Sequence, residues 1–317
     1  MLLGLGRSGT TFLAKLIDSA PDVLYRHEPD AVLPTDLPAY VDADQLAPHL
    51  ARAKDYVLAM ADCRHWRAAD HLPIFRKAYR GVPADAAYRL LVLSTKIARR
   101  CRLQRWQNLP DLVDRSSGGR LHLIKSVSAL GRARLFAEAV PGLAVIHIIR
   151  HPCAVCASLR VGIEKGVMGA KIALKPLFAQ KESEKYPFSL EEIERAPLEQ
   201  QIAYRWMLAN DKAAADMAGR PTYLQIRYED LCANVDRVSC QVFEHLGLTL
   251  GPQTRRFIAE ISKAPTDRER AVGYFRVQRP ITSAVDKWKN QLDPRTVDRI
   301  SDIVSHSPLG RAYFDGA

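Results

Sequence analysis

The chain has 317 residues, of which 47% are hydrophobic and 26% are charged, a composition typical of a soluble globular protein. Basic residues outnumber acidic ones by 46 to 35, and the formal net charge of +11 favours polyanionic partners such as nucleic acid, acidic glycan or phosphorylated nucleotide. No apolar run reaches the roughly 18 residues that span a bilayer, and no signal-peptide pattern is present, so we expect a cytoplasmic protein without a transmembrane segment. Because no basic run is interleaved with aromatic residues, we expect no nucleic-acid partner.

A glycine-rich turn, GLGRSGTT at residues 4–11, joins an apolar strand expected at 1–5 to a helix expected at 12–19. The turn nearly matches G-x-x-x-x-G-K-[ST], a loop whose backbone N–H groups cradle phosphates. Thr10 occupies the lysine position, and Arg7 is the remaining cation. NTP hydrolysis is therefore disfavoured, whereas an anion cradle at a helix N-terminus is favoured. The alternative is an ordinary strand-to-helix turn.

Strands and helices alternate along much of the chain. Further strands are expected at 22–26, 120–127, 143–150 and 222–228. Further helices are expected at 130–140, 152–160, 198–218, 235–246, 253–262, 285–290 and 294–305. The continuous apolarity of 143–150 indicates a strand buried on both faces of a parallel sheet. The predicted fold class is α/β, a P-loop-like three-layer fold with a central parallel sheet flanked by helices, plus helical insertions.

Two segments interrupt the alternation. Residues 31–119 form a predicted helical insertion, with helices expected at 44–61, 70–79 and 84–101. Residues 162–197 are charged and irregular in pattern, which suggests a lid. Since no linker or repeat is evident, we interpret residues 1–317 as a single domain.

The six cysteines are scattered, which is typical of reduced thiols. Cys153 and Cys156 form a C-x-x-C at an expected helix start, where a redox or zinc role is conceivable. No second C-x-x-C supplies further zinc ligands, so we favour buried packing for this pair.

Polar residues lie at the C-terminal ends of the predicted strands, the edge where open α/β sheets bind ligands. They are Arg7, Glu28, Lys125, Ser126, Arg150, Tyr228 and Glu229. A nucleotide hydrolase would often carry a magnesium-holding Asp where Arg150 stands. An arginine binds an anion directly with bidentate geometry, and Ser158, two turns into the next helix, can face the same anion. The alternative for Arg150 is a surface ion pair at a strand end.

Four segments in this order resemble the sulfotransferase family. They are GRSGTTFLAKLIDSAPDVLYRHEP (6–29), LAVIHIIRHPCAVCASLR (143–160), IRYEDL (226–231) and VDKWKNQL (285–292). The first is more similar to the bacterial and carbohydrate-type branch than to the cytosolic phenol and steroid branch. The resemblance implies transfer of a sulfuryl group from 3′-phosphoadenosine 5′-phosphosulfate (PAPS) to an acceptor hydroxyl or amine. The product is 3′-phosphoadenosine 5′-phosphate (PAP), and no metal is required.

The resemblance also implies roles for individual residues. The loop that cradles the 5′-phosphosulfate comprises Arg7, Ser8, Gly9, Thr10, Thr11 and Phe12. Arg150 and Ser158 correspond to the residues that hold the 3′-phosphate, and Tyr228 to one near the adenine.

The chain departs from the family pattern at several positions. Val127 stands where the cytosolic branch has its catalytic His, so the base is expected to be Glu28, as in carbohydrate-type members, or the adjacent His27. The Arg-Lys-Gly triplet expected before the late Trp is missing, and Arg276 or Arg279 is expected to replace it at the 3′-phosphate. His151 replaces the Asp of the common Arg-Asp-Pro.

The expected mechanism is an in-line displacement at sulfur. Glu28 removes the acceptor proton, while Lys125 and Arg7 stabilise charge on the departing phosphate oxygen. Two alternatives remain, a metal-dependent P-loop phosphotransferase or kinase, and a polyanion- or nucleic-acid-binding module.

The acceptor is expected to be a small molecule, a lipid or a glycan that contacts residues 31–119 and 162–197. Basic residues of the insertion permit an acidic acceptor, and Trp66 and Trp106 permit ring stacking with sugars or aromatic groups. These basic residues are Arg64, Arg67, Arg99, Arg100 and Arg102.

Overall fold

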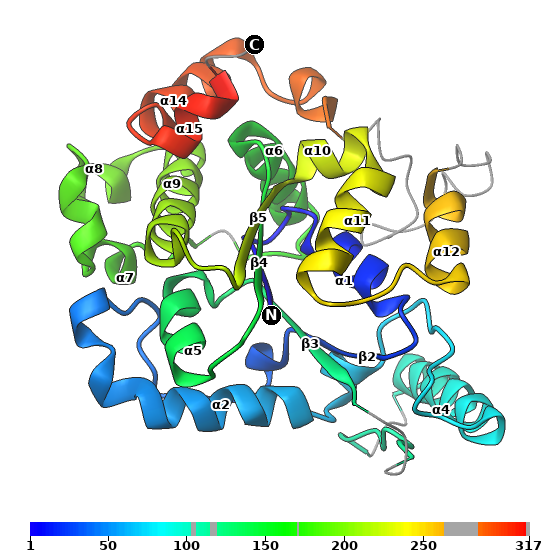
Figure 1. The fold of residues 1–317 in the computed structure, drawn as a ribbon. Helices are drawn as coiled ribbons and strands as arrows, with labels where there is room; N and C mark the ends of the chain where they lie inside the picture. The colour runs from blue at the N-terminus through cyan, green and yellow to red at the C-terminus, as the bar shows by residue number, and fades with distance from the viewer. Residues whose placement is uncertain (103–105, 115–118, 170, 263–284, 315–317) are drawn as a thin grey trace.

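A computed structural model describes residues 1–102, 106–114, 119–169, 171–262 and 285–314. Its centre is a five-stranded parallel sheet with strand order β2-β3-β1-β4-β5. The strands are β1 (Leu2–Leu3), β2 (Val23–His27), β3 (Leu121–Ser126), β4 (Val145–Ile149) and β5 (Tyr223–Arg227). Figure 1 shows the sheet with helices on both sides, so the predicted α/β fold with a central parallel sheet is confirmed.

The sheet is buried on both faces because neighbouring residues of a strand enter different cores. Leu2 and Ile146 belong to one hydrophobic cluster, whereas Leu3 and Val145 belong to the other. One cluster packs under α1 (Thr10–Asp18), α11 (Val235–His245) and α12 (Pro252–Ser262). The other packs under α2 (Leu50–Asp62), α5 (Ala133–Ala139), α6 (Pro152–Glu164) and α9 (Leu198–Met217). This double burial explains why strand 143–150 is continuously apolar.

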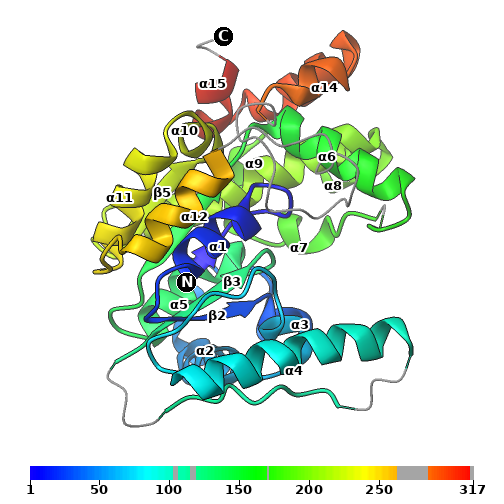
Figure 2. The same ribbon diagram turned by 90° about the vertical axis from the view of Figure 1, so that its right-hand side faces the viewer.

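The connection from β2 to β3 carries the helical insertion. Its longest helix, α4 (Val82–Arg100), lies at the outer edge of the molecule, and the short α3 (Trp66–Ala69) lies between α4 and the sheet (Figure 2). The chain closes with the 3₁₀ turn η7 (Lys287–Asn290), α14 (Pro294–Val304) and α15 (Pro308–Phe314). The division of the chain into one domain with this insertion stays a prediction.

Three local predictions were wrong. Residues 70–79 are not helical; the carbonyls of His71 and Pro73 accept from the side chain of Lys15 instead of forming helical hydrogen bonds. Tyr228 begins the short helix α10 (Tyr228–Ala233) and does not end the preceding strand. Residues 162–197 are not wholly irregular, since they hold α7 (Lys175–Phe178) and α8 (Leu190–Arg195). Across the described ranges, no helix is both long enough and apolar enough to cross a membrane.

Candidate active site

A cavity of about 590 Å³ lies where the strands of the sheet end. It is lined by the glycine-rich loop, the start of α6, the end of β3 and residues of the insertion. The structure brings together eleven residues that the sequence indicated: Arg7, Gly9, Thr10, Thr11, Phe12, His27, Glu28, Lys125, Arg150, Ser158 and Tyr228. Ser8 is buried in the loop, and its side chain is not among those lining the cavity. Arg276 and Arg279 lie outside the described residues.

The loop after β1 has the left-handed backbone that a tight strand-to-helix turn requires. Gly9, the N-cap of α1, has φ +86°, and Arg7 has φ 76°. The ring of Tyr228 lies directly over Gly9, where a Cβ would come within 2.3 Å of Tyr228 Cδ2. Only glycine therefore fits at this position, because any other residue would strain the backbone at this φ and would bring a Cβ into the Tyr228 ring. The N-terminal N–H groups of α1 begin at the loop, an arrangement suited to binding an anion.

The two arginines of the site are joined through the loop backbone and α6. Arg7 Nε donates to Ser158 Oγ at 2.8 Å. Arg150 donates from NH1 to the carbonyl of Arg7 at 3.0 Å, and its guanidinium lies 4.6 Å from the centre of the Tyr228 ring. The Arg150 carbonyl accepts from the buried Trp206 indole at 2.8 Å. These contacts hold both guanidinium groups beside the helix N-terminus, as the strand-end positions predicted.

Glu28 and Lys125 form an ion pair at the cavity wall. Lys125 Nζ contacts Glu28 Oε1, and the side chain of Lys125 is almost fully buried whereas that of Glu28 is 29% exposed. Burial lowers the pKa of Lys125, while the neighbouring Glu28 carboxylate opposes that shift. Glu28 has φ 44°, a conformation that is uncommon outside glycine and that marks the sharp turn after β2. The backbone N–H of Glu28 donates to the Lys125 carbonyl at 2.8 Å, so both residues are fixed to adjacent strands.

His27 lies beside this pair in a neutral, buried position. Its Nδ1 is 2.7 Å from the Tyr25 hydroxyl, and its Nε2 is 3.8 Å from Glu28 Oε1. Its ring stacks on that of His71, with 3.3 Å between ring centres. Burial, followed by repulsion from His71, Lys125 and Lys15, lowers the pKa of His27 far below its ordinary value. Burial also lowers the pKa of His71, to about 3.

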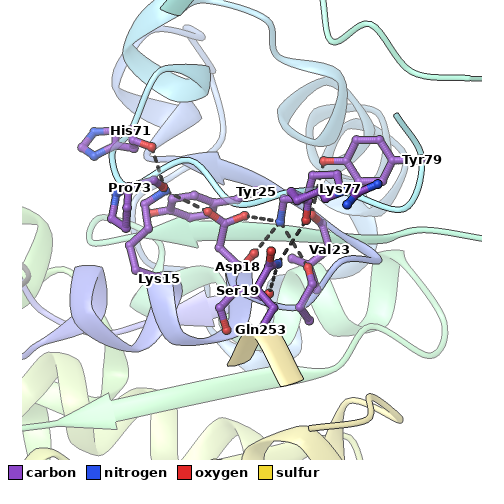
Figure 3. A network of polar contacts seen from close by, with 12 residues as sticks. Lys15, Asp18, Ser19, Val23, Tyr25, His71, Pro73, Lys77, Tyr79 and Gln253 are labelled. Carbon is purple, nitrogen blue, oxygen red and sulfur yellow. Dashed lines mark hydrogen bonds and ion pairs between the residues drawn. The ribbon is translucent and has the colours of Figure 1, made fainter. Parts of the chain in front are cut away.

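His71 and Leu72 reach the cavity from the insertion, although no sequence pattern indicated either residue. A buried network holds their segment against α1 (Figure 3). Lys15 Nζ donates to the carbonyl oxygens of His71 at 2.8 Å and of Pro73 at 3.1 Å, and it pairs with Asp18 at 2.8 Å. Lys77 pairs with the other oxygen of Asp18, also at 2.8 Å. The network therefore fixes where the insertion meets the active-site strands.

The late segment VDKWKNQL contributes Lys287, Trp288 and Gln291 to the cavity. The Trp288 ring stacks on His151, with 4.5 Å between ring centres. His151 replaces the Asp of the family pattern but still caps α6, because its Nδ1 accepts from the Cys153 N–H at 3.2 Å. Burial lowers its pKa to about 4, so it stays neutral and can accept that hydrogen bond. This segment was indicated by resemblance, but no role for these side chains was predicted.

Cys153 and Cys156 face the core, as predicted. Both are fully buried, and burial raises the pKa of each thiol to about 12. Thiols with such pKa values carry little thiolate at neutral pH and are poorly reactive. Within the described part of the chain, no group of three or more His, Cys, Asp or Glu side chains is placed to hold a metal ion.

Comparisons with known proteins agree with the family that the motifs suggested. A family model described as the sulfotransferase family matches residues 1–252. No curated protein matches the chain. Similar solved structures include the sulfotransferase domain from the curacin biosynthetic pathway, with 16% identity, a TM-score of 0.45 and 96% of each chain covered. The mouse sulfotransferase SULT7A1 complexed with PAP has 12% identity and a TM-score of 0.44, covering 99% of this chain and 87% of that one. The sulfotransferase domain from the Synechococcus PCC 7002 olefin synthase has 18% identity and a TM-score of 0.44, covering 95% and 92%.

Proposed function

The chain belongs to the sulfotransferase family, and from that premise we propose that it transfers a sulfuryl group from PAPS to an acceptor hydroxyl or amine. The charge of the cavity is the observation that carries the proposal. Among the described residues, its lining includes five cations, Arg7, Lys125, Arg150, Lys165 and Lys287, but one carboxylate, Glu28. Such a surplus fits a donor with two separate anionic groups better than a neutral ligand.

The two ends of the donor would occupy different parts of this cavity. The loop amides at the N-terminus of α1, with Thr10, Thr11 and Arg7, would bind the 5′-phosphosulfate. Arg150 and Ser158 would bind the 3′-phosphate, and the Tyr228 ring would pack near the adenine. The contact between Arg7 and Ser158 supports this assignment because it joins a residue of the loop to a residue assigned to the 3′-phosphate.

The transfer would be an in-line displacement. The acceptor oxygen forms a bond to sulfur as the bond between sulfur and the bridging phosphate oxygen breaks, which releases PAP. Glu28 takes the acceptor proton, and the negative charge that develops on the phosphate oxygen is stabilised by Lys125 and Arg7. The ion pair between Lys125 and Glu28 keeps the base and the cation at the same cavity wall before substrates bind.

Glu28 is a better candidate for the base than His27. The pKa of His27 is lowered so far by burial that its imidazole would hold a proton only weakly, and its Nδ1 is engaged with Tyr25. Glu28 is the more exposed of the two side chains, at 29% against 14%. An acceptor can therefore approach the carboxylate more readily than the imidazole.

Replacement of the proposed base tests this assignment. Glu28→Gln should lower turnover by about 100-fold or more, the range for loss of a general base, while PAP binding stays within a fewfold of wild type. Glu244→Gln, on the exposed face of α11, is the matched control and should retain full turnover. Near-normal turnover in Glu28→Gln would remove Glu28 from its role and direct attention to His27.

Calorimetric titration separates the proposed activity from its alternatives. We expect PAP to bind much more tightly than adenosine 5′-monophosphate, which lacks the 3′-phosphate. A P-loop phosphotransferase would instead prefer ATP with magnesium. A polyanion-binding module would bind a short duplex with an affinity that falls steeply with salt and would ignore the 3′-phosphate.

A further inference from the structure

Helix α4 exposes an apolar stripe on the outer side of the insertion. Val82, Leu90, Leu93 and Ile97 are large hydrophobic residues that are exposed, Leu90 by 69% and Ile97 by 64%. The last three recur at helical spacing and share one face. The opposite face is packed, because Tyr88 and Val92 are buried in a small cluster with Leu109. Figure 2 looks onto α4 from outside, and no described helix or strand covers it.

The segment around the stripe carries a surplus of positive charge, although Asp85 of α4 pairs with Arg89 at 2.9 Å and Asp70 pairs with Arg99 and Lys96. Residues 86–110 contain six arginines and lysines and no acidic residue. On α4 itself, Arg89 has a side chain that is 44% exposed, and Arg100 is exposed at its C-terminal end. Trp106, six residues further on, is 75% exposed. Exposed apolar residues and arginines on one helix, followed in the chain by an exposed tryptophan, are typical of helices that lie on an anionic lipid surface.

The stripe is connected to the cavity through Asp70. From α4, Arg99 NH1 contacts Asp70 Oδ2 at 2.7 Å and Lys96 Nζ contacts it at 3.4 Å. The two residues that follow, His71 and Leu72, line the cavity, and Leu72 is 46% exposed. Two ion pairs to Asp70 therefore join α4 to the segment of the insertion that lines the cavity.

We propose that the outer face of α4 docks on an anionic membrane surface and thereby presents the cavity to an amphiphilic acceptor held in that membrane. Presentation of the cavity to an acceptor rests on the proposed sulfuryl transfer. Docking of α4 on the membrane does not. Apolar side chains at the centre of the face enter the boundary between headgroups and acyl chains, while the arginines contact the anionic headgroups.

A second copy of this chain is the competing occupant, because the spacing of Leu90, Leu93 and Ile97 also fits a helical seam. Charge argues against it. Pairing of two α4 helices would add the positive surplus of both copies; Arg89 is paired with Asp85, but Arg100 has no carboxylate among residues 86–110 to offset it. A negatively charged surface is complementary to this face, whereas the same face on a second copy of the chain carries like charge and is not complementary.

Sedimentation of the full chain with vesicles tests the docking without any turnover assay. We expect the protein to pellet with vesicles of phosphatidylcholine and phosphatidylglycerol, and to pellet much less with phosphatidylcholine alone. The double variant Leu90→Glu with Ile97→Glu should lose this binding, since it places carboxylates at exposed positions of the face. Leu58→Glu is the matched control, because Leu58 is 51% exposed on α2 and lies outside the stripe. Arg100→Gln should weaken binding by about fivefold, as expected for loss of one basic residue near an anionic surface.

Equal pelleting of the double variant and Leu58→Glu would overturn the proposal, as would binding that ignores the anionic lipid. A wild-type dimer in analytical ultracentrifugation that the double variant dissociates, with no vesicle binding, would assign the face to self-association instead. Titration with PAP distinguishes this failure from failure of the sulfotransferase assignment. If vesicle binding is lost while PAP binding is intact, only the proposal for α4 fails. If PAP binding is absent, only the assignment of the cavity fails.

Discussion

Substitution of Gly9 by alanine tests how the glycine-rich loop is held. At this residue φ is +86°, a conformation that costs an alanine roughly 1–2 kcal/mol. The new Cβ would also lie 2.3 and 2.5 Å from two atoms of the Tyr228 ring, far inside van der Waals contact. Displacing that ring resembles overpacking of a core, which costs about 1–3 kcal/mol more. We therefore expect Gly9→Ala to lower the free energy of unfolding by about 2–5 kcal/mol.

Gly142→Ala separates the backbone cost of an alanine at positive φ from the cost of its contact with the Tyr228 ring. Gly142 has a similar φ of +77°, but a Cβ there would meet no atom within 4 Å. In urea unfolding, this control should show only the backbone cost of about 1–2 kcal/mol. Because Tyr228 also packs on the Arg150 guanidinium, Gly9→Ala should in addition weaken PAP binding by at least about tenfold, whereas Gly142→Ala should not change it.

A double-mutant cycle identifies Tyr228 as the origin of the difference. Tyr228→Ala in the Gly9→Ala background removes the clash, so the two changes should couple by about 1–3 kcal/mol. Additive effects in the cycle, or equal destabilisation by Gly9→Ala and Gly142→Ala, would refute the contact between the loop and this ring.

Two further predictions concern buried charge. Asp18→Ala leaves Lys15 and Lys77 buried without a carboxylate and should cost about 3–5 kcal/mol in urea unfolding; a loss below about 1 kcal/mol would contradict the network. Burial lowers the pKa of His147 to about 4, below its unfolded value, so protonation of the unfolded chain should reduce stability as the pH falls from about 6.5 towards 4. His147→Gln should make this decline shallower by up to about 1.4 kcal/mol per pH unit, and equal slopes between pH 7 and 5 would argue against it.

The loop and the strand-end residues of the site could be predicted from sequence because a parallel sheet determines where they meet. Arg7, Lys125 and Arg150 lie at or after the C-terminal ends of three neighbouring strands, and strand direction alone brings them to one edge. Each position could be read from local apolar patterning without knowledge of tertiary contacts. The loop also carries its own signal, since Gly9 must adopt a left-handed conformation whatever surrounds it.

The contribution of the insertion could not be predicted in the same way. The segment 70–79, which contains Pro73, was predicted to be helical, but its carbonyl groups bind Lys15 and its Lys77 pairs with Asp18 on α1. These are contacts between residues more than fifty positions apart, and local propensity contains no information about them. For the same reason His71 was missed, although it stacks on His27 at the cavity wall.

The net charge of +11 does not by itself show where in the structure the positive charge lies. The cavity lining has four more positive than negative residues, and residues 86–110 have six cations without an acid, so the remainder of the chain is nearly neutral. The two surpluses lie in different settings that suit different ligands: a compact nucleotide in the concave cavity and an extended anionic surface along the exposed face of α4. A polyanion-binding module would need its cations on one continuous face to follow a phosphate backbone. The arrangement of the charge, more than its amount, is what favours a nucleotide-using enzyme over that alternative.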